Sequence, residues 1–190
     1  MPITAILEKN AKLYPNDVSL VEINPQVKEQ TKVTWKEYSL IEAGSKSVGR
    51  REMTWEEFNK KANLFANLLL SRGVKKGDKV AILLMNCLEW LPIYFGVLKT
   101  GALAVPLNYR YTAQEIKYCL NLAECQTLIF GPEFTGRVEE IHPRLSRIKF
   151  TFYVGEDCPT FAESYDELVT YCSSKSPNIE ISDDDDGAIY

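Results

Sequence analysis

The chain is 190 residues long, with 45% apolar and 25% charged residues, the composition of an ordinary globular domain that buries a core. Its 22 lysines and arginines against 26 aspartates and glutamates give a net charge of -4, which offers no overall attraction for nucleic acid or an anionic membrane. No apolar run approaches the roughly 18 residues that span a bilayer, and residues 1–15 lack the layout of a secretory signal. We therefore expect a globular protein of the cytoplasm.

The cysteines support the same compartment. There are five of them, an odd number, and they are widely spaced, mostly inside apolar patterns, and form no C-x-x-C pair. They are Cys87, Cys119, Cys125, Cys158 and Cys172. This usage is typical of reduced thiols in a cytoplasmic protein.

The first 52 residues predict a small unit followed by an irregular one. Apolar residues recur at near-helical spacing over residues 3–13, and a Pro-Asn-Asp turn then leads to a short strand at residues 19–23. Residues 24–52 are polar and have no sustained period, so we interpret them as an insert or a hairpin. Within them, residues 33–38 repeat the form of residues 53–58, but the repeat is too short to indicate a domain duplication.

A helix is expected to start at Thr54. Its hydroxyl can cap the helix while Glu57 reaches back, and Met53 and Phe58 occupy the positions of a hydrophobic staple. The apolar stripe continues until Arg72-Gly73, where glycine provides the left-handed cap.

From residue 79 onward the pattern alternates between strand and helix. We expect strands at residues 79–84, 103–107, 127–130 and 148–154, and helices over about 86–99, 112–123 and 138–145. In the first of these helices Asn86 and Glu89 resemble a capping arrangement, but Pro92 lies deep, so the helix starts late or bends there. This rhythm predicts an α/β fold with a doubly wound, mainly parallel sheet and helices on both faces, the main unit covering residues 53–155.

The pattern thins over residues 156–190. Ser164 and Glu167 predict one more helix through about Cys172, and a polar connector follows. The acidic run Asp183–Asp186 lacks the alternating spacing of a calcium loop, so we interpret it as a solvated turn that opens into a strand at residues 187–190.

Motifs for catalysis are missing from the sequence. It contains neither G-x-G-x-x-G after a strand nor G-x-x-x-x-G-K-[ST], the two common ways of holding phosphates at a helix amino terminus. The single histidine, His142, has no serine or cysteine nucleophile pattern around it, so we expect a structural or solvent role. We assign no catalytic and no metal-ligating residue.

Two loops are candidates for ligand contact. Residues 108–111 and 131–137 are polar or basic, and each follows a predicted parallel strand, where open α/β sheets bind ligands. Ordinary surface turns remain the alternative interpretation. Aromatic side chains such as Trp55 and Tyr111 do not predict stacking on nucleic acid, because no basic groove accompanies them.

The middle of the chain resembles the amino-terminal part of AMP-forming acyl-CoA synthetases of the long-chain fatty-acid–CoA ligase type, members of the adenylate-forming superfamily. The resemblance depends on the order and spacing of several segments. They are Met53-Thr-Trp-Glu-Glu-Phe58, Gly73-Val-Lys-Lys-Gly-Asp-Lys-Val-Ala-Ile82, Gly96-Val-Leu-Lys-Thr-Gly-Ala102, Pro106-Leu-Asn-Tyr-Arg110 and Tyr118-x-Leu-Asn-x-Ala-Glu124. The last residues, Asp184 to Tyr190, resemble the acidic turn and strand that precede the family's Ser/Thr/Gly-rich phosphate loop.

The resemblance implies an enzyme that activates a carboxylic acid, of the fatty-acid type, with Mg-ATP to an acyl adenylate and transfers the acyl group to coenzyme A. It also implies that the phosphate loop, the acyl pocket and the catalytic lysine lie outside the 190 residues, so that the chain alone is expected to be inactive and to bind none of ATP, Mg or coenzyme A tightly. For Tyr109, Arg110 and Arg137 it implies contacts with the coenzyme A nucleotide, because loops at matching places in relatives lie near that ligand. Guanidinium groups suit its phosphates.

Two alternatives remain open. The chain could be a self-sufficient module that uses residues 108–111 and 131–137 for a small anionic ligand, or an interaction or structural domain. Apolar surface next to an incomplete sheet also predicts self-association. The sequence does not select an acyl chain length or a thiol acceptor.

Overall fold

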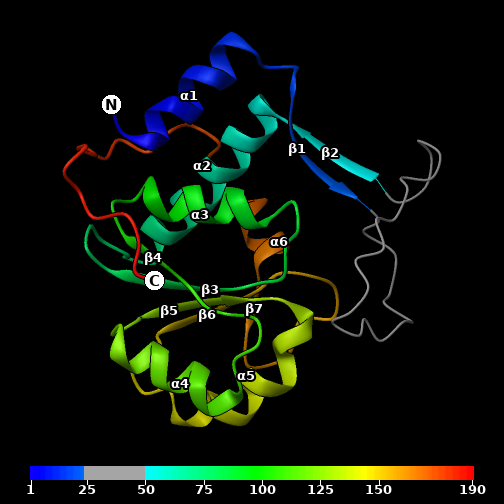
Figure 1. Cartoon of the computed structure of the whole chain (residues 1–190), viewed down its shortest axis with the longest axis vertical. Coiled ribbons are helices and arrows are strands. Elements are labelled where there is room, and N and C mark those ends of the chain that lie inside the picture. The colour runs from blue at the N-terminus through cyan, green and yellow to red at the C-terminus, as the bar shows by residue number, and fades with distance from the viewer. Residues whose placement is uncertain (24–49) are drawn as a thin grey trace, which may run out of the picture.

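The computed structural model describes residues 1–23 and 50–190 (Figure 1). The expected insert or hairpin, apart from its last three residues, and the repeat at residues 33–38 lie outside the described residues. The helices are α1 Ile3–Leu13, α2 Trp55–Ser71, α3 Trp90–Leu98, α4 Ala113–Leu122, α5 Thr135–Ile141 and α6 Tyr165–Val169, with short 3-10 turns at Pro132–Phe134 and His142–Arg144. The strands are β1 Val18–Ile23, β2 Arg50–Thr54, β3 Lys79–Leu83, β4 Leu103–Pro106, β5 Thr127–Phe130, β6 Phe150–Tyr153 and β7 Glu163–Ser164.

A five-stranded sheet with the order β4-β3-β5-β6-β7 forms the centre, and every neighbouring pair in it is parallel. In Figure 1, α2 and α3 lie on one face of this sheet, and α4 and α5 lie on the other. Successive residues of β3 alternate between the two layers, since Val80 and Ile82 join one apolar cluster while Ala81 and Leu83 join the other. The predicted doubly wound α/β fold is confirmed.

Helices α2 and α3 pack closely because Gly96 has no side chain. A Cβ placed on Gly96 would lie 2.9 Å from Cδ1 of Phe65 and 3.0 Å from the carbonyl oxygen of Ala62. The start of α2 is as expected, because the Thr54 hydroxyl accepts from the backbone N–H of Glu57 and the Glu57 carboxylate accepts from that of Thr54. The same capping box starts α4, at Thr112.

A smaller unit covers the outer side of α2. β1 and β2 pair antiparallel, and β2 is an element that the sequence pattern did not reveal. Leu7 of α1 and Met53 of β2 meet Phe58, Ala62 and Leu88 in a third apolar cluster. This contact anchors α1 and the two-stranded sheet to the main domain.

The last residues of the chain pair with β4, at one edge of the five-stranded sheet. The backbone N–H of Ala104 donates to the carbonyl of Gly187, and the N–H of Ile189 donates to the carbonyl of Ala104. Ala188 thereby forms a parallel bridge with Ala104. Residues 187–189 therefore run alongside β4 in the direction of the other strands, which agrees with the expected strand start.

Several element boundaries differ from the sequence analysis. Helix α5, expected over residues 138–145, spans Thr135–Ile141 and is followed by a 3-10 turn at His142–Arg144. Helix α3 begins at Trp90 rather than Asn86, which places Pro92 in its first turn, and Glu89 makes no capping hydrogen bond. Strand β6 begins at Phe150, two residues after its expected start, and α6 ends at Val169 instead of near Cys172. Helix α3 and strand β6 thus begin later, and α6 ends earlier, than the apolar pattern predicts.

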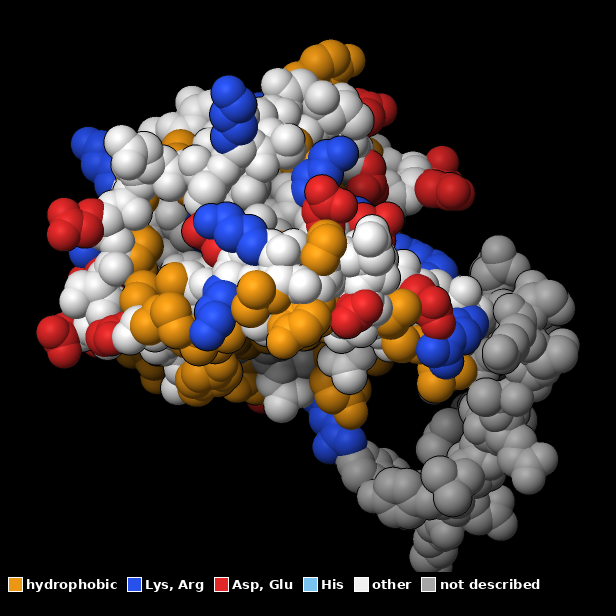
Figure 2. Space-filling model, turned by 90° about the horizontal axis from the view of Figure 1, so that it is seen from above, with side chains coloured by type: hydrophobic (Ala, Val, Ile, Leu, Met, Phe, Trp, Pro, Cys, Tyr) orange, Lys and Arg blue, Asp and Glu red, His pale blue; other side chains and the backbone are white. Residues whose placement is uncertain are grey.

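No helix in the described ranges is both long and apolar enough to cross a membrane. Figure 2 looks down on the molecule from the α1 side, and apolar side chains gather across the lower part of this view with lysine or arginine side chains between them. Exposed apolar residues of α1 and the turn after it include Ile3, Ile6, Leu13 and Tyr14.

Candidate functional site

The strand order creates a switch point between β3 and β5. The chain leaves β3 toward α3 on one face of the sheet and leaves β5 toward α5 on the other, so the two exit loops diverge. Crevices of this kind, outside the carboxyl ends of parallel strands, are where open α/β sheets bind ligands. A pocket of about 420 Å³ lies there, lined by both exit loops, including Asn86 and Gly131, and by Gly155 after β6.

Carboxylates dominate the charge of this crevice. Of the described residues that line it, Glu22, Glu89, Glu133 and Asp166 are acidic and Arg51 is the one cation. Such a lining repels phosphate groups, because like charges at close range are unfavourable. The crevice therefore suits a ligand part that carries no negative charge.

The crevice arginine is held in place by ion pairs. Arg51 lies 3.5 Å from the Glu22 carboxylate and also pairs with Glu89, to which Lys61 approaches within 3.9 Å. Burial would lower the pKa of Arg51, but the adjacent Glu89 and Glu22 outweigh it and raise the pKa. Burial and the neighbouring Glu89 raise the pKa of Asp166, which also lines the crevice, although a backbone hydrogen bond from Gly155 opposes the change.

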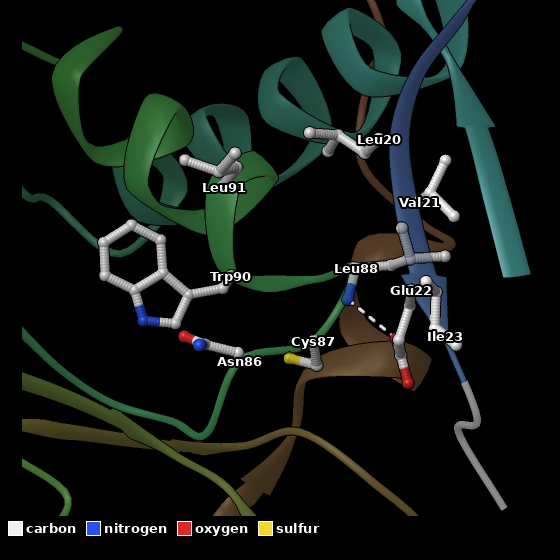
Figure 3. A pocket seen from close by; sticks show the side chains of 9 residues that line it. All are labelled: Leu20, Val21, Glu22, Ile23, Asn86, Cys87, Leu88, Trp90 and Leu91. Carbon is white, nitrogen blue, oxygen red and sulfur yellow. Dashed lines mark hydrogen bonds between the residues drawn. The ribbon is translucent and has the colours of Figure 1, made fainter. Parts of the chain in front are cut away.

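An apolar groove continues from the crevice along β1. It has a volume of about 510 Å³ and shares Glu22, Ile23, Asn86 and Cys87 with the crevice. Figure 3 shows Trp90 and Leu91 on the α3 side of the groove and side chains of β1 across from them.

Two polar groups in the groove are accounted for within the protein. The Glu22 carboxylate accepts a 2.9 Å hydrogen bond from the backbone N–H of Leu88, and burial raises the pKa of the Cys87 thiol to about 12. The thiol is therefore uncharged at neutral pH, and the groove is an apolar extension of a polar crevice.

The three residues expected to contact a nucleotide lie together, in the loop after β4 and in α5. Tyr109 and Arg110 follow β4, while Arg137 lies in α5. One nitrogen of the Arg137 guanidinium donates to the carbonyls of Tyr109, at 2.8 Å, and Tyr111, at 2.7 Å. The guanidinium also lies 4.8 Å from the ring centre of Phe134. Arg137 thus fastens the loop after β4 to the start of α5.

Arg110 and Tyr109 form the outer part of this arrangement. Nε of Arg110 donates to the Tyr109 hydroxyl at 3.0 Å, and the guanidinium lies 5.3 Å from the ring centre. Both side chains are exposed to solvent. A solvent-exposed guanidinium beside an aromatic ring suits a phosphate and a base.

The other residues considered in the sequence take structural positions. The His142 ring packs against Phe161, with ring centres 5.0 Å apart. In the acidic run, Asp185 pairs with Lys76 at 2.6 Å and Asp183 pairs with the amino terminus. Across residues 1–23 and 50–190, no group of three or more candidate ligands could hold a metal ion. All five cysteines are unpaired thiols.

Sequence reasoning missed the switch-point crevice. In the sequence, Asn86 and Glu89 indicate only a helix cap, and Glu22 and Arg51 lie in β1 and β2, far from them along the chain. The alternating pattern does show that the loop with Asn86 and Glu89 follows a strand, and on that ground it could have been predicted as a ligand-binding loop. Only the strand order singles it out, because the switch point depends on which strands are neighbours.

A comparison with protein families matches residues 7–189, nearly the whole chain, to the family described as AMP-binding enzyme. Among curated proteins, the chain is 36% identical over 101 residues to a medium/long-chain-fatty-acid–CoA/3-oxocholest-4-en-26-oate–CoA ligase of Mycolicibacterium smegmatis, covering 53% of the chain and 18% of that relative. It is 30% identical over 130 residues to the long-chain-fatty-acid–CoA ligase FadD13 of Mycobacterium tuberculosis, covering 68% and 25%. The matches span a quarter or less of these relatives.

Solved structures share the fold. The N-terminal domain of FACL13 from Mycobacterium tuberculosis superposes with a TM-score of 0.77 at 23% identity, covering 100% of this chain and 41% of that one. The anthranilate CoA ligase AuaEII, in complex with anthranoyl-AMP, gives a TM-score of 0.80 at 23% identity, with 99% and 32% covered. The parallel sheet with helices on both faces and the match over residues 7–189 lead to one conclusion. The chain belongs to the AMP-binding enzyme family.

Proposed function

We propose that the chain forms the amino-terminal part of an AMP-forming acyl-CoA ligase, which activates a carboxylic acid with Mg-ATP and transfers the acyl group to coenzyme A. The family match over residues 7–189 carries this proposal. It is supported by relatives that are named as ligases of fatty acids and of carnitine or crotonobetaine. A fatty acid is the substrate class that we favour, and the unpaired thiols agree with a cytoplasmic location.

Within that enzyme, the loop after β4 contributes to the coenzyme A nucleotide site. Arg110 supplies positive charge and Tyr109 supplies a ring face, and both side chains are exposed. Arg137 acts through the loop, since its guanidinium binds the carbonyls of Tyr109 and Tyr111. The acidic crevice at the switch point is a poor place for phosphates by comparison.

The proposal is tested by carboxylate-dependent exchange of pyrophosphate into ATP. The longer protein encoded with this chain is expected to catalyse the exchange and to form an acyl-CoA thioester, whereas the 190-residue chain alone is expected to show neither. Clear exchange by the isolated chain would contradict the assignment of the chemistry to other residues. A reading frame that stops after Tyr190 would rule out the longer enzyme.

The nucleotide contacts are tested separately in the longer enzyme. Arg110→Glu and Arg137→Glu should each raise KM for coenzyme A about tenfold, with little change in adenylate formation. Lys117→Glu, on α4, is a matched charge reversal away from the loop. A response to coenzyme A that equals that of the Lys117 variant would remove the substituted residue from the site.

A further inference from the structure

A side chain from the turn before β3 contacts the last part of the chain, residues 180–185. Lys76 lies in the turn before β3, and Gly101 in the turn before β4 packs against its stem. A Cβ on Gly101 would lie 2.8 Å from Cγ of Lys76, and Gly101 has a φ of +74°, so glycine suits this position for both reasons. The stem thus directs the Lys76 ammonium toward residues 180–185.

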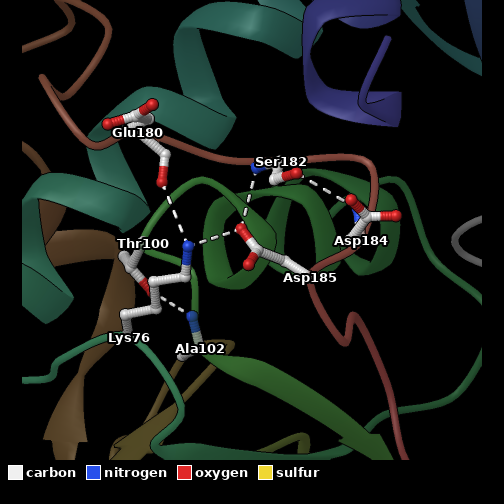
Figure 4. A network of polar contacts seen from close by, with 7 residues as sticks. All are labelled: Lys76, Thr100, Ala102, Glu180, Ser182, Asp184 and Asp185. Atoms are coloured by element: carbon white, nitrogen blue, oxygen red, sulfur yellow. Dashed lines mark hydrogen bonds and ion pairs between the residues drawn. The ribbon is translucent and has the colours of Figure 1, made fainter.

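One carboxylate oxygen is the centre of the contact. Oδ2 of Asp185 accepts from Nζ of Lys76 at 2.6 Å and from the backbone N–H of Ser182 at 2.8 Å. Nζ of Lys76 also donates to the carbonyl of Glu180 at 3.3 Å (Figure 4). The Lys76 ammonium therefore contacts both ends of the segment 180–185 and holds this segment as a turn.

The strand that follows has little pairing of its own. Residues 187–189 form two backbone hydrogen bonds with β4, both on Ala104. Register in a sheet is specified by a buried face or by turn geometry, and a slip of one residue exchanges the two faces of a strand. Ala188 and Ile189 pack against the two apolar clusters, which favours this register. Because only one residue of β4 is engaged, the turn at Asp185 is a second feature that can select which residue meets Ala104.

We propose that Lys76 and Asp185 are a latch that sets the register of residues 187–189 on β4. Since this segment runs parallel to β4, any chain that follows Tyr190 leaves at the carboxyl edge of the sheet, where the candidate sites lie. Lys76 and Asp185 are thus positioning residues for the ligand-binding edge. Their importance for catalysis rests on the proposed function, whereas the latch itself does not.

Amide hydrogen exchange on the 190-residue chain tests the latch without any activity. Lys76→Met and Asp185→Asn should each speed exchange of the Ile189 amide at least threefold, because each removes a charge-assisted contact of the turn. The Ile82 and Ile129 amides in β3 and β5 should keep their protection. Lys76→Arg, which retains the charge and the donors, should restore slow exchange at Ile189.

Asp183→Asn is the matched control. Asp183 lies in the same turn, but its pair with the amino terminus is more than half exposed, so it contributes little. The latch is overturned if both test variants change exchange at Ile189 less than threefold, if Asp183→Asn has the same effect, or if Ile82 and Ile129 lose protection equally. None of these outcomes bears on ligase activity.

Discussion

At the level of single residues, Lys99 carries a charge into the interior. Its side chain is 2% exposed, and its Nζ lies 2.6 Å from Oε1 of Glu8 on α1. Burial lowers the pKa of Lys99, and the hydrogen bond and charge of Glu8 oppose that change. The pair therefore ties α1 to the end of α3 as long as both partners are present.

Removing Glu8 and removing Lys99 should lower the free energy of unfolding by different amounts. Glu8→Ala leaves a buried ammonium without a partner, which should cost about 3 kcal/mol in the free energy of unfolding. Lys99→Met removes the buried charge and leaves Glu8, 32% exposed, to bind water, so it should cost less than about 1 kcal/mol. Urea unfolding measures both values. A larger loss for Lys99→Met than for Glu8→Ala would contradict this account.

The same pair predicts a pH dependence. Burial would raise the pKa of Glu8, but hydrogen bonds from Lys99 and Ser176 outweigh it and hold the pKa below the ordinary value of a glutamate. A carboxyl group whose folded pKa is depressed stabilises the protein above its unfolded pKa and loses that contribution as the pH falls through the folded pKa. The stability difference between wild type and Glu8→Gln should therefore be constant from pH 6 to 7 and shrink below about pH 4.5. Urea unfolding at several pH values measures it, and a constant difference down to pH 3 would contradict it.

At the level of elements, the crossing of α2 and α3 requires a close approach. Gly96→Ala should destabilise the protein by about 1–3 kcal/mol even though alanine favours helices, because the new Cβ meets Phe65 and the Ala62 carbonyl. Gly136→Ala in α5 is the matched control, since its Cβ meets nothing within 4 Å. It should be neutral or stabilise by up to about 1 kcal/mol. Thermal unfolding measures the stability of both variants. Equal effects would show that the close approach at Gly96 does not cause the loss of stability.

At the level of the whole molecule, apolar surface on α1 predicts concentration-dependent self-association. Ile3 is 53% exposed and Ile6 is 43% exposed on this helix. Sedimentation velocity should show an average mass that rises with concentration and does not fall with added salt, because the contact is apolar. Ile3→Lys with Ile6→Lys should reduce the association, whereas Lys9→Glu should not. A monomer at all concentrations would contradict the prediction.

Much of the architecture was predictable because its signals are local. The capping boxes at Thr54 and Thr112 use side chains three residues apart, and the sequence located both helix starts. The start of α3 was harder to locate. The Glu89 carboxylate pairs with Arg51 and Lys61 instead of capping the helix, and these partners lie outside the local sequence window.

The candidate site was also predictable from the sequence only in part. The loops that hold Tyr109, Arg110 and Arg137 were selected from sequence because each follows a predicted strand. That Arg137 binds the carbonyls of Tyr109 and Tyr111 could not be foreseen, since the contact joins residues 26 and 28 positions apart.

The α/β class, the alternation of strands and helices, and the family resemblance are all predictable from the sequence, because periodicity, caps and motif spacing are properties of neighbouring residues. The strand order, the acidic crevice beside β3 and the contact between Lys76 and Asp185 depend instead on how the chain folds. The latch joins side chains separated by 109 positions. Contacts of that range depend on how the whole chain packs, and no local pattern encodes them.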